Sequence, residues 1–159
     1  MAPQNIIEFS IATQDDLPEI ISLLADDELG RLREQKADEL DPAYQTAFHE
    51  IASDQNNELI FGKLGGRVDG KVIAVLQITY IPSLTLRGSK RAQIEGVRVS
   101  SQLRGQGMGR KLFDFAFDRA KKRGCKLVQL TTNKARPDAH RFYESLGLKP
   151  THEGFKFAL

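Results

Sequence analysis

The stretch that decides the fold runs from Ile94 to Leu112 and reads IEGVRVSSQLRGQGMGRKL. It begins as an apolar alternation, passes through a short polar turn, places glycine at Gly105, Gly107 and Gly109, and then becomes helical in pattern. Because glycine has no Cβ, successive backbone N–H groups can face one concavity. The unpaired N–H groups and the positive dipole end of the following helix favour a bound anion. The stretch therefore predicts a strand, a phosphate-binding loop and a helix.

The glycine spacing separates this loop from two other phosphate-binding loops. A Walker A loop needs GxxxxGK followed by Ser or Thr, but Gly109 is followed by the residues RKL. A dinucleotide fingerprint needs GxGxxG with an acidic residue about 20 positions later. This loop reads GxGxG, and GCK lies at 124–126. Nucleotide hydrolysis and nicotinamide binding are not expected, and a glycine-rich turn without a ligand is the structural alternative.

Two overlapping patterns lie in the loop, Gln102-x-x-Gly105-x-Gly107 and Arg104-x-x-Gly107-x-Gly109. Farther along, residues 141–148 read RFYESLGL. Together these segments resemble the acetyl-CoA pyrophosphate loop and the late tyrosine helix of the GNAT superfamily of N-acetyltransferases. The resemblance covers about the last two-fifths of the chain tightly, and the first half only in its order of elements.

The resemblance implies how acetyl-CoA, as co-substrate, would be held without a metal. The strands ending at Val99 and Thr132 would splay apart, and the pantetheine arm would enter the gap. Many members have Asn shortly before the tyrosine, where this chain has Arg136, so Asn133 either replaces that contact or the contact is absent. The expected cofactor-binding residues are Val97, Arg98, Val99, Gln102, Arg104, Gly105, Gln106, Gly107, Met108, Gly109, Arg110 and Asn133.

Two side chains are candidates for catalysis. Glu95 lies in an otherwise apolar strand and would act as general base, because an amine with a pKa of about 10 attacks a thioester only as the free base. Tyr143 matches the family's tyrosine and would protonate the departing thiolate. A backbone N–H at Gly96 or Val97 would stabilise the developing oxyanion. The alternatives are a solvent-facing Glu95 and a Tyr143 that only packs in the core.

Composition narrows the function classes. The 159 residues, 40% hydrophobic and 28% charged, predict one domain over 1–159. A formal charge of +2 and the absence of a helix-turn-helix pattern give little support to a DNA-binding regulator. The single cysteine, Cys125, is expected to be a packing residue, and the histidines His49, His140 and His152 lack metal-ligand spacing. Without a secretory leader pattern or an apolar run of about 18 residues, a cytoplasmic protein is expected.

Apolar periodicity predicts the fold class, an α/β (α+β) arrangement with a mixed, mostly antiparallel, twisted sheet, helices on both faces and one splayed parallel pair. A hairpin is expected at Asp69-Gly70 and a bulge near Gly65-Gly66. The expected strands are 7–11, 59–68, 72–80, 92–99, 127–132 and 155–159, and the expected helices begin at Asp15 or Asp16, Asp41-Pro42, Gly109 and Pro137.

Two further segments have open interpretations. The connection 81–91 either covers the acceptor site or simply ends a hairpin. The acidic residues Asp26, Asp27 and Glu28 either attract a cationic amine or form a solvated loop.

The expected function is transfer of an acetyl group from acetyl-CoA to a primary amine of a small molecule or peptide, by direct attack in a ternary complex. The alternative is a non-catalytic acyl-CoA-binding sensor or regulatory module. The expected partners are acetyl-CoA and the acceptor, with a homodimer as an option and neither membrane nor nucleic acid.

Overall fold

The structure is a computed structural model that describes residues 7–26, 30, 41–65 and 70–159. Its centre is a five-stranded sheet in the order β1-β2-β3-β4-β5. The first four strands pair antiparallel and β5 joins β4 in parallel, which confirms the predicted mixed sheet with one parallel pair. The strands are β1 (Ile7–Ile11), β2 (Asn57–Leu64), β3 (Lys71–Ile81), β4 (Arg91–Val99) and β5 (Leu127–Leu130).

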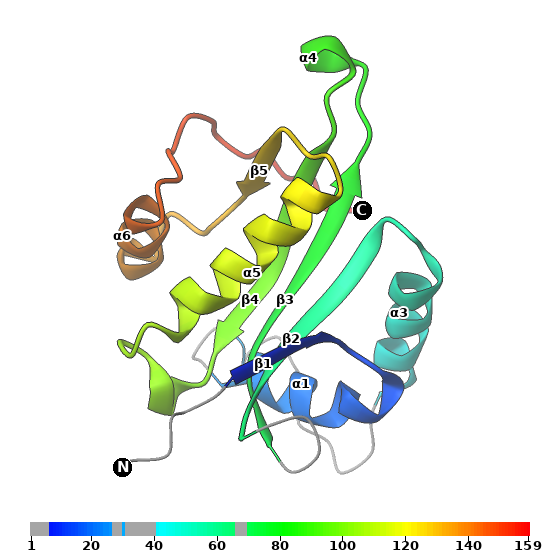
Figure 1. Cartoon of the computed structure of the whole chain (residues 1–159), viewed down its shortest axis with the longest axis vertical. Helices are drawn as coiled ribbons and strands as arrows, with labels where there is room; N and C mark the ends of the chain where they lie inside the picture. Colours follow the sequence, from blue (N-terminus) through cyan, green and yellow to red (C-terminus); the bar gives the residue numbers. More distant parts are fainter. Residues whose placement is uncertain (1–6, 27–29, 31–40, 66–69) are drawn as a thin grey trace.

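Helices cover both faces of the sheet, as predicted. On one face α5 lies along β3 and β4, with α6 beside it (Figure 1). On the other face α1 and α3 cover a second apolar cluster with Phe61, Val72 and Val75. The helices are α1 (Leu17–Leu24), α3 (Pro42–Ser53), α4 (Thr85–Gly88), α5 (Met108–Lys122) and α6 (Pro137–Ser145), and the 3-10 turns are η1 (Gln14–Asp16) and η2 (Ser101–Leu103).

Local capping explains where the early helices begin. Thr13 and Asp16 form a capping box, in which the Thr13 backbone N–H donates to Asp16 Oδ2 at 2.9 Å. The chain therefore makes the η1 turn before α1 begins, one residue later than predicted. Asp41 accepts a hydrogen bond from the Ala43 N–H at 2.9 Å and caps α3, as predicted.

The irregularity predicted near Gly65-Gly66 lies earlier in β2. The register of β2 against β3 shifts between Gly62 and Lys63. A Cβ at Gly62 would lie 2.8 Å from Phe9 Cε1 on β1, so close packing of β1 on β2 requires glycine there. Gly65 has a φ of 86° just after the strand, and Asp69 of the predicted hairpin turn lies outside the described residues.

The parallel pair is splayed, as expected. Pairing of β4 with β5 runs from Arg91–Leu127 to Ile94–Leu130 and stops there, while β4 continues to Val99. Gly96 has a φ of 61°, and the β3–β4 register shifts between Val75 and Gln77 beside it. Figure 1 shows the second part of β4 running on toward the start of α5 without β5 alongside.

Two predictions for the last third of the chain are wrong. The strand predicted over 127–132 is shorter and less buried, because β5 pairs only with β4 at the sheet edge and leaves Leu127 45% exposed. The strand predicted over 155–159 is absent, because no sheet partner takes it up in this structure. Phe155 and Phe157 are 94% and 89% exposed, and Leu159 is fully exposed.

A buried polar network ties β2, β3 and α5 together. Arg119 on α5 donates to the Glu58 carboxylate through Nε and, at 2.7 Å, through Nη2. The Tyr80 hydroxyl donates to Glu58 Oε2 at 2.9 Å. Burial raises the pKa of Glu58, but the hydrogen bonds from Arg119 and Tyr80 outweigh it and the net pKa is lowered. Burial and the Glu58 carboxylate raise the pKa of Tyr80 to about 12.

Candidate active site

The glycine loop has the geometry that the sequence predicted for an anion site. Gly105 and Gly107 have φ values of 76° and 78°, and a Cβ at either would meet nothing within 4 Å. Backbone conformation, not crowding, therefore favours glycine at both positions. Gly107 is the N-cap of α5, and the first bond within the helix is Lys111 N to Gly107 O at 3.2 Å. The first-turn N–H groups of residues 108–110 precede that bond and are available to a ligand.

The side chains of the loop divide into exposed and structural groups. Gln102, Arg104 and Gln106 are exposed, and Gln106 Nε2 donates to the Gln102 carbonyl at 3.2 Å. Two others hold the fold, since Met108 is buried and Arg110 Nη2 donates to the Ser145 carbonyl of α6 at 2.7 Å.

Gly109 differs from the other two glycines of the loop. A Cβ there would lie 2.8 Å from Phe142 Cζ, so the first turn of α5 needs glycine to pack against α6. The sequence could not separate this packing requirement from a cofactor contact, because both require glycine.

The second half of β4 provides the open backbone beside the loop. Val97, Arg98 and Val99 extend beyond the last residue that pairs with β5, and Ala74 and Val75 of β3 pair on the other side. Their β5-side backbone groups therefore face the opening between β4 and β5, where the resemblance places the pantetheine arm. The Arg98 guanidinium donates to the Val97 carbonyl at 2.9 Å and to the Leu24 carbonyl at 3.4 Å.

Tyr143 lies on α6, half-buried in an aromatic group. Its ring centroid is 5.7 Å from that of Phe113 and 5.5 Å from that of Phe142. Burial raises the pKa of its hydroxyl, and Arg136 and Arg98 oppose the shift in part. The phenol is therefore held in its neutral, proton-donating form at neutral pH.

Glu95 lies on the opposite face of the sheet from α5. Its neighbour Ile94 is buried in the α5 cluster, and strand alternation turns Glu95 the other way, where it is exposed and pairs in register with Gln77. On this face the Glu95 carboxylate is open to solvent and to an acceptor. It adjoins Gly96 and the point at which β4 and β5 separate.

Asn133 makes hydrogen bonds within its own loop. Its side-chain Oδ1 accepts from the Ala135 N–H at 2.9 Å, and its carbonyl accepts from the Arg136 N–H at 3.0 Å. The side-chain amino group and the second lone pair of Oδ1 are left for a coenzyme contact.

One residue of the acidic segment after α1, Asp26, has a structural role. Asp26 Oδ2 accepts a hydrogen bond from the Ser101 N–H at 2.8 Å, which ties the end of α1 to the start of the glycine loop. Asp27 and Glu28 lie outside the described residues, and the role predicted for the connection 81–91 stays a prediction.

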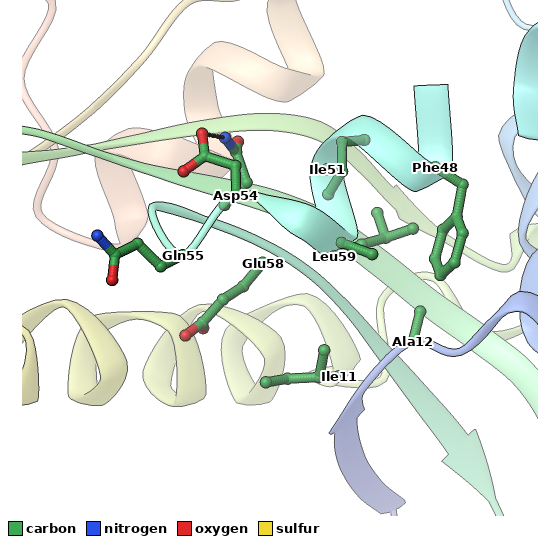
Figure 2. Close-up of a pocket in the computed structure, with 10 residues that line it drawn as sticks. Ile11, Ala12, Phe48, Ile51, Asp54, Gln55, Glu58 and Leu59 are labelled. Carbon is green, nitrogen blue, oxygen red and sulfur yellow. Dashed lines mark hydrogen bonds between the residues drawn. The ribbon is translucent and has the colours of Figure 1, made fainter. Parts of the chain in front are cut away.

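A separate pocket of about 330 Å³ lies between α3, β1 and β2 (Figure 2). Phe48, Ile51 and Leu59 form its apolar wall, while Glu58 points toward α5 and away from them (Figure 2). Both of its carboxylates are engaged, Glu58 by Arg119 and Asp54 by the Asn56 N–H and Asn57 Nδ2. The described residues that line this pocket therefore offer no unengaged carboxylate.

Other candidate groups contribute little. Within residues 7–26, 30, 41–65 and 70–159, no group of three or more His, Cys, Asp or Glu side chains could hold a metal ion. The same residues include no helix long and apolar enough to cross a membrane. Cys125 is half-buried against the core and burial raises the pKa of its thiol, in keeping with the predicted packing role.

A model of the Acetyltransferase (GNAT) family matches residues 18–148. The chain belongs to this family, whose members use acetyl-CoA, and its predicted class of acetyltransferase is confirmed. A curated relative, the aminoalkylphosphonate N-acetyltransferase of Salmonella typhimurium, is 40% identical over 67 residues, which are 42% of this chain and 44% of that protein. The match thus spans less than half the length of that relative.

Solved structures match over nearly the whole chain. The crystal structure of a transcriptional regulator from Bacillus halodurans C-125 is 49% identical with a TM-score of 0.90, covering 97% of this chain and 100% of that one. A putative acetyltransferase from Agrobacterium tumefaciens str. C58 is 24% identical with a TM-score of 0.79, covering 96% and 99%, and shows the same fold.

Proposed function

We propose that this protein, as one domain over 1–159, transfers an acetyl group from acetyl-CoA to a primary amine of a small molecule or peptide. The observation that carries the proposal is the end of β4–β5 pairing at Ile94 and Leu130, after which the rest of β4, η2 and the open glycine loop follow along the chain. This segment offers two kinds of backbone group, one after the other. The strand backbone that is unpaired on the β5 side can bind the amides of an extended arm, and the N–H groups at the start of α5 can bind a diphosphate. The Salmonella relative, an aminoalkylphosphonate N-acetyltransferase, supports an amine acceptor.

The cofactor-binding residues divide by the part of the coenzyme that they contact. Val97, Arg98 and Val99 bind the pantetheine arm through their backbones. The loop and the first turn of α5 bind the pyrophosphate, with Asn133 contributing its side-chain amino group from the far side of the opening. The pyrophosphate residues are Gln102, Arg104, Gly105, Gln106, Gly107, Met108, Gly109 and Arg110.

The acceptor reacts by direct attack. Glu95 takes the proton that the ammonium group of the acceptor must lose, directly or through a water molecule, and the free amine then attacks the thioester carbonyl. The tetrahedral intermediate then collapses, the C–S bond breaks, and the Tyr143 hydroxyl gives its proton to the departing thiolate. The second proton of the attacking nitrogen passes to the Tyr143 phenolate, which leaves a neutral amide and a neutral tyrosine. The position of Glu95 on one face of the sheet and of Tyr143 on the other supports this division, because the reacting groups would lie in the opening between them.

The test follows free coenzyme thiol while the protein is incubated with acetyl-CoA and a broad set of primary amines. We expect thiol release that depends on the amine and saturates with it. Tight acetyl-CoA binding without amine-dependent release would overturn the proposed transfer reaction.

The second candidate function is acyl-CoA sensing, in which the same site holds the coenzyme and a partner reads its presence. The match to the Bacillus halodurans structure favours this candidate, because that protein is a transcriptional regulator by name. The thiol assay separates the two functions, since a sensor binds acetyl-CoA and releases no thiol with any amine.

Self-association and location complete the proposal. The edge of β5 and the alternating apolar residues Phe155, Phe157 and Leu159 are each without a sheet partner in the described chain, and a second copy would supply both. We therefore propose a homodimer through this edge.

The one unpaired cysteine agrees with a cytoplasmic location.

A further inference from the structure

One row of polar side chains crosses four strands on the same face of the sheet as Glu95. In register, Asn57 of β2 pairs with Thr79 of β3, Thr79 pairs with Gln93 of β4, and Gln93 pairs with Gln129 of β5. Neighbouring strands lie about 4.8 Å apart, so these four side chains form a continuous line across the sheet. All four are partly exposed.

Hydrogen bonds fix the row from within. Gln129 Nε2 donates to Gln93 Oε1 at 2.7 Å, and Thr79 Oγ1 donates to Asn57 Oδ1 at 2.7 Å. Gln77, directly opposite Glu95, joins the row by donating to Asn57 Oδ1 at 3.1 Å. An amide has two N–H donors and an oxygen with two lone pairs, so each bonded amide keeps donors or acceptors for a ligand.

The row lies at the place where the acceptor must sit if Glu95 is the base. Gln93 precedes Glu95 by two residues on the same strand face, about 6.6 Å away along β4. Gln77 lies across from Glu95 on β3. An acceptor that places its amine at Glu95 would therefore lay the rest of its length against Gln77, Gln93 and Gln129.

The side chains of the row itself are neutral and rich in hydrogen-bonding groups. Besides Glu95, two charged residues lie on this face of β4. Arg98, in register with Val75, lies on the other side of Glu95 from Gln93, and its guanidinium donates to the Leu24 and Val97 carbonyls. Arg91 is four residues from Glu95 and about 13 Å along the strand. A small acceptor with its amine at Glu95 would end before it. Amide side chains match hydroxyl and carboxamide groups, since each can both donate and accept, whereas an anionic group calls for a cation beside it.

We propose that the side chains of Gln77, Gln93 and Gln129 select the acceptor, and that the acceptor is a primary amine whose remainder carries neutral hydroxyl or carboxamide groups. This inference rests on the proposed acetyl transfer and names its substrate class. Gln93 and Gln129 hold each other in place and present their remaining polar atoms to the acceptor. They are specificity residues that act on the part of the acceptor that does not react.

The experiment compares matched amines in the thiol-release assay. Serinol and isopropylamine share a carbon skeleton and differ by two hydroxyls, and 2-aminoethylphosphonate supplies an anionic acceptor. We expect kcat/KM to be at least about tenfold higher for serinol than for isopropylamine, and about tenfold higher than for the phosphonate, since one hydrogen bond gained in the transition state is worth roughly that factor. Equal values for serinol and isopropylamine, or the highest value for the phosphonate, would overturn the inference.

Variants locate the preference on the row. Gln93→Met and Gln129→Met keep the side-chain length and remove the amide, so each should lower the ratio of serinol to isopropylamine by about tenfold. The matched control is Gln45→Met on the exposed side of α3, which should leave the ratio at the wild-type value. The KM for acetyl-CoA and the thermal midpoint of each variant report whether the site and the fold remain intact.

The outcomes distinguish the inference from the function on which it rests. Absence of thiol release with every amine overturns the transfer reaction and this inference together. Amine-dependent release with a ratio that Gln93→Met and Gln129→Met leave unchanged overturns the inference alone.

Discussion

One substitution can separate the proposed chemical role of Tyr143 from its structural role. Its ring packs on Phe113 and Phe142, and its hydroxyl has a raised pKa. Tyr143→Phe keeps the ring and removes the proton donor, so kcat should fall about 100-fold or more while the KM for acetyl-CoA changes little. Steady-state kinetics with saturating amine measure both quantities. Wild-type turnover in the variant would remove Tyr143 from the mechanism.

Glu95 is tested by a readout that a structural role would not change. Glu95→Gln removes the base but leaves a similar shape on an exposed face of β4, so kcat/KM for the amine should fall by about 100-fold near neutral pH. The loss should shrink as the pH rises toward the pKa of the amine, because the free base is then already present. The pH profile of kcat/KM measures this convergence, and Glu144→Gln on the exposed side of α6 is the control. A loss that is constant with pH would argue against proton removal by Glu95.

At the level of single residues, the sequence predicted the glycine loop because the local backbone conformation there requires that amino acid. The positive φ at Gly105 and Gly107 explains why their pattern was readable. The row through Gln93 and Gln129 was not predicted from the sequence, because the sequence alone does not show which side chains lie beside a polar strand residue, and the strand register does.

At the scale of the element, the start of α5 is the part of the proposed coenzyme site that the backbone alone would provide. Gly107→Val adds a side chain where first-turn N–H groups face the ligand, so the Kd for acetyl-CoA should rise at least tenfold. Its φ of 78° also means strain, of about 1–2 kcal/mol. Isothermal titration calorimetry measures the Kd.

The matched control for that prediction is Gly124→Val at the other end of α5. Gly124 has a φ of 75° and open space around its Cβ position, so the strain is similar. Its variant should lose comparable stability and keep the wild-type Kd. Equal Kd values for Gly107→Val and the wild type would count against the loop assignment.

The Glu58–Arg119 pair connects β2 to α5, and its loss should be a stability effect. Glu58→Gln leaves Arg119 and the Tyr80 hydroxyl without the carboxylate, which should lower the free energy of unfolding by about 1–3 kcal/mol. The control is Asp118→Asn, an exposed neighbour on the same helix. Urea unfolding of both variants at neutral pH measures the difference, and equal midpoints for Glu58→Gln and the wild type would contradict it.

The same network predicts the pH dependence of stability. The pKa of Glu58 is lowered in the folded state, so its contribution is present above its ordinary pKa and is lost as the pH falls. The pKa of Tyr80 is raised to about 12, so its contribution is present below its ordinary value of about 10 and is lost as the pH rises from there through about 12. Urea midpoints of the wild type should therefore decline at both extremes, and Glu58→Gln should show a weaker acid decline.

At the scale of the whole molecule, features that depend on residues close in sequence could be predicted, and features that depend on distant residues could not. The order of strands and helices was readable because each element carries its own periodicity and caps, as with Asp41 before α3. The Glu58–Arg119 pair could not be predicted from the sequence, because its two residues are 61 positions apart and neither lies in a motif. The strand predicted over 155–159 was wrong for a related reason, since alternation shows that a segment can form a strand and not that a sheet edge takes it up.

That segment and the β5 edge give the last prediction. Phe155, Phe157 and Leu159 alternate and are almost fully exposed, and β5 pairs on only one side in the described chain. If a second copy covers them, light scattering during size-exclusion chromatography should give twice the monomer mass of 17.8 kDa. Replacing all three residues with Ser should return the mass to that of the monomer, because the apolar contact is lost. Lys156→Ser, between them in the segment, should remain a dimer, and a monomeric wild-type protein would contradict the proposed homodimer.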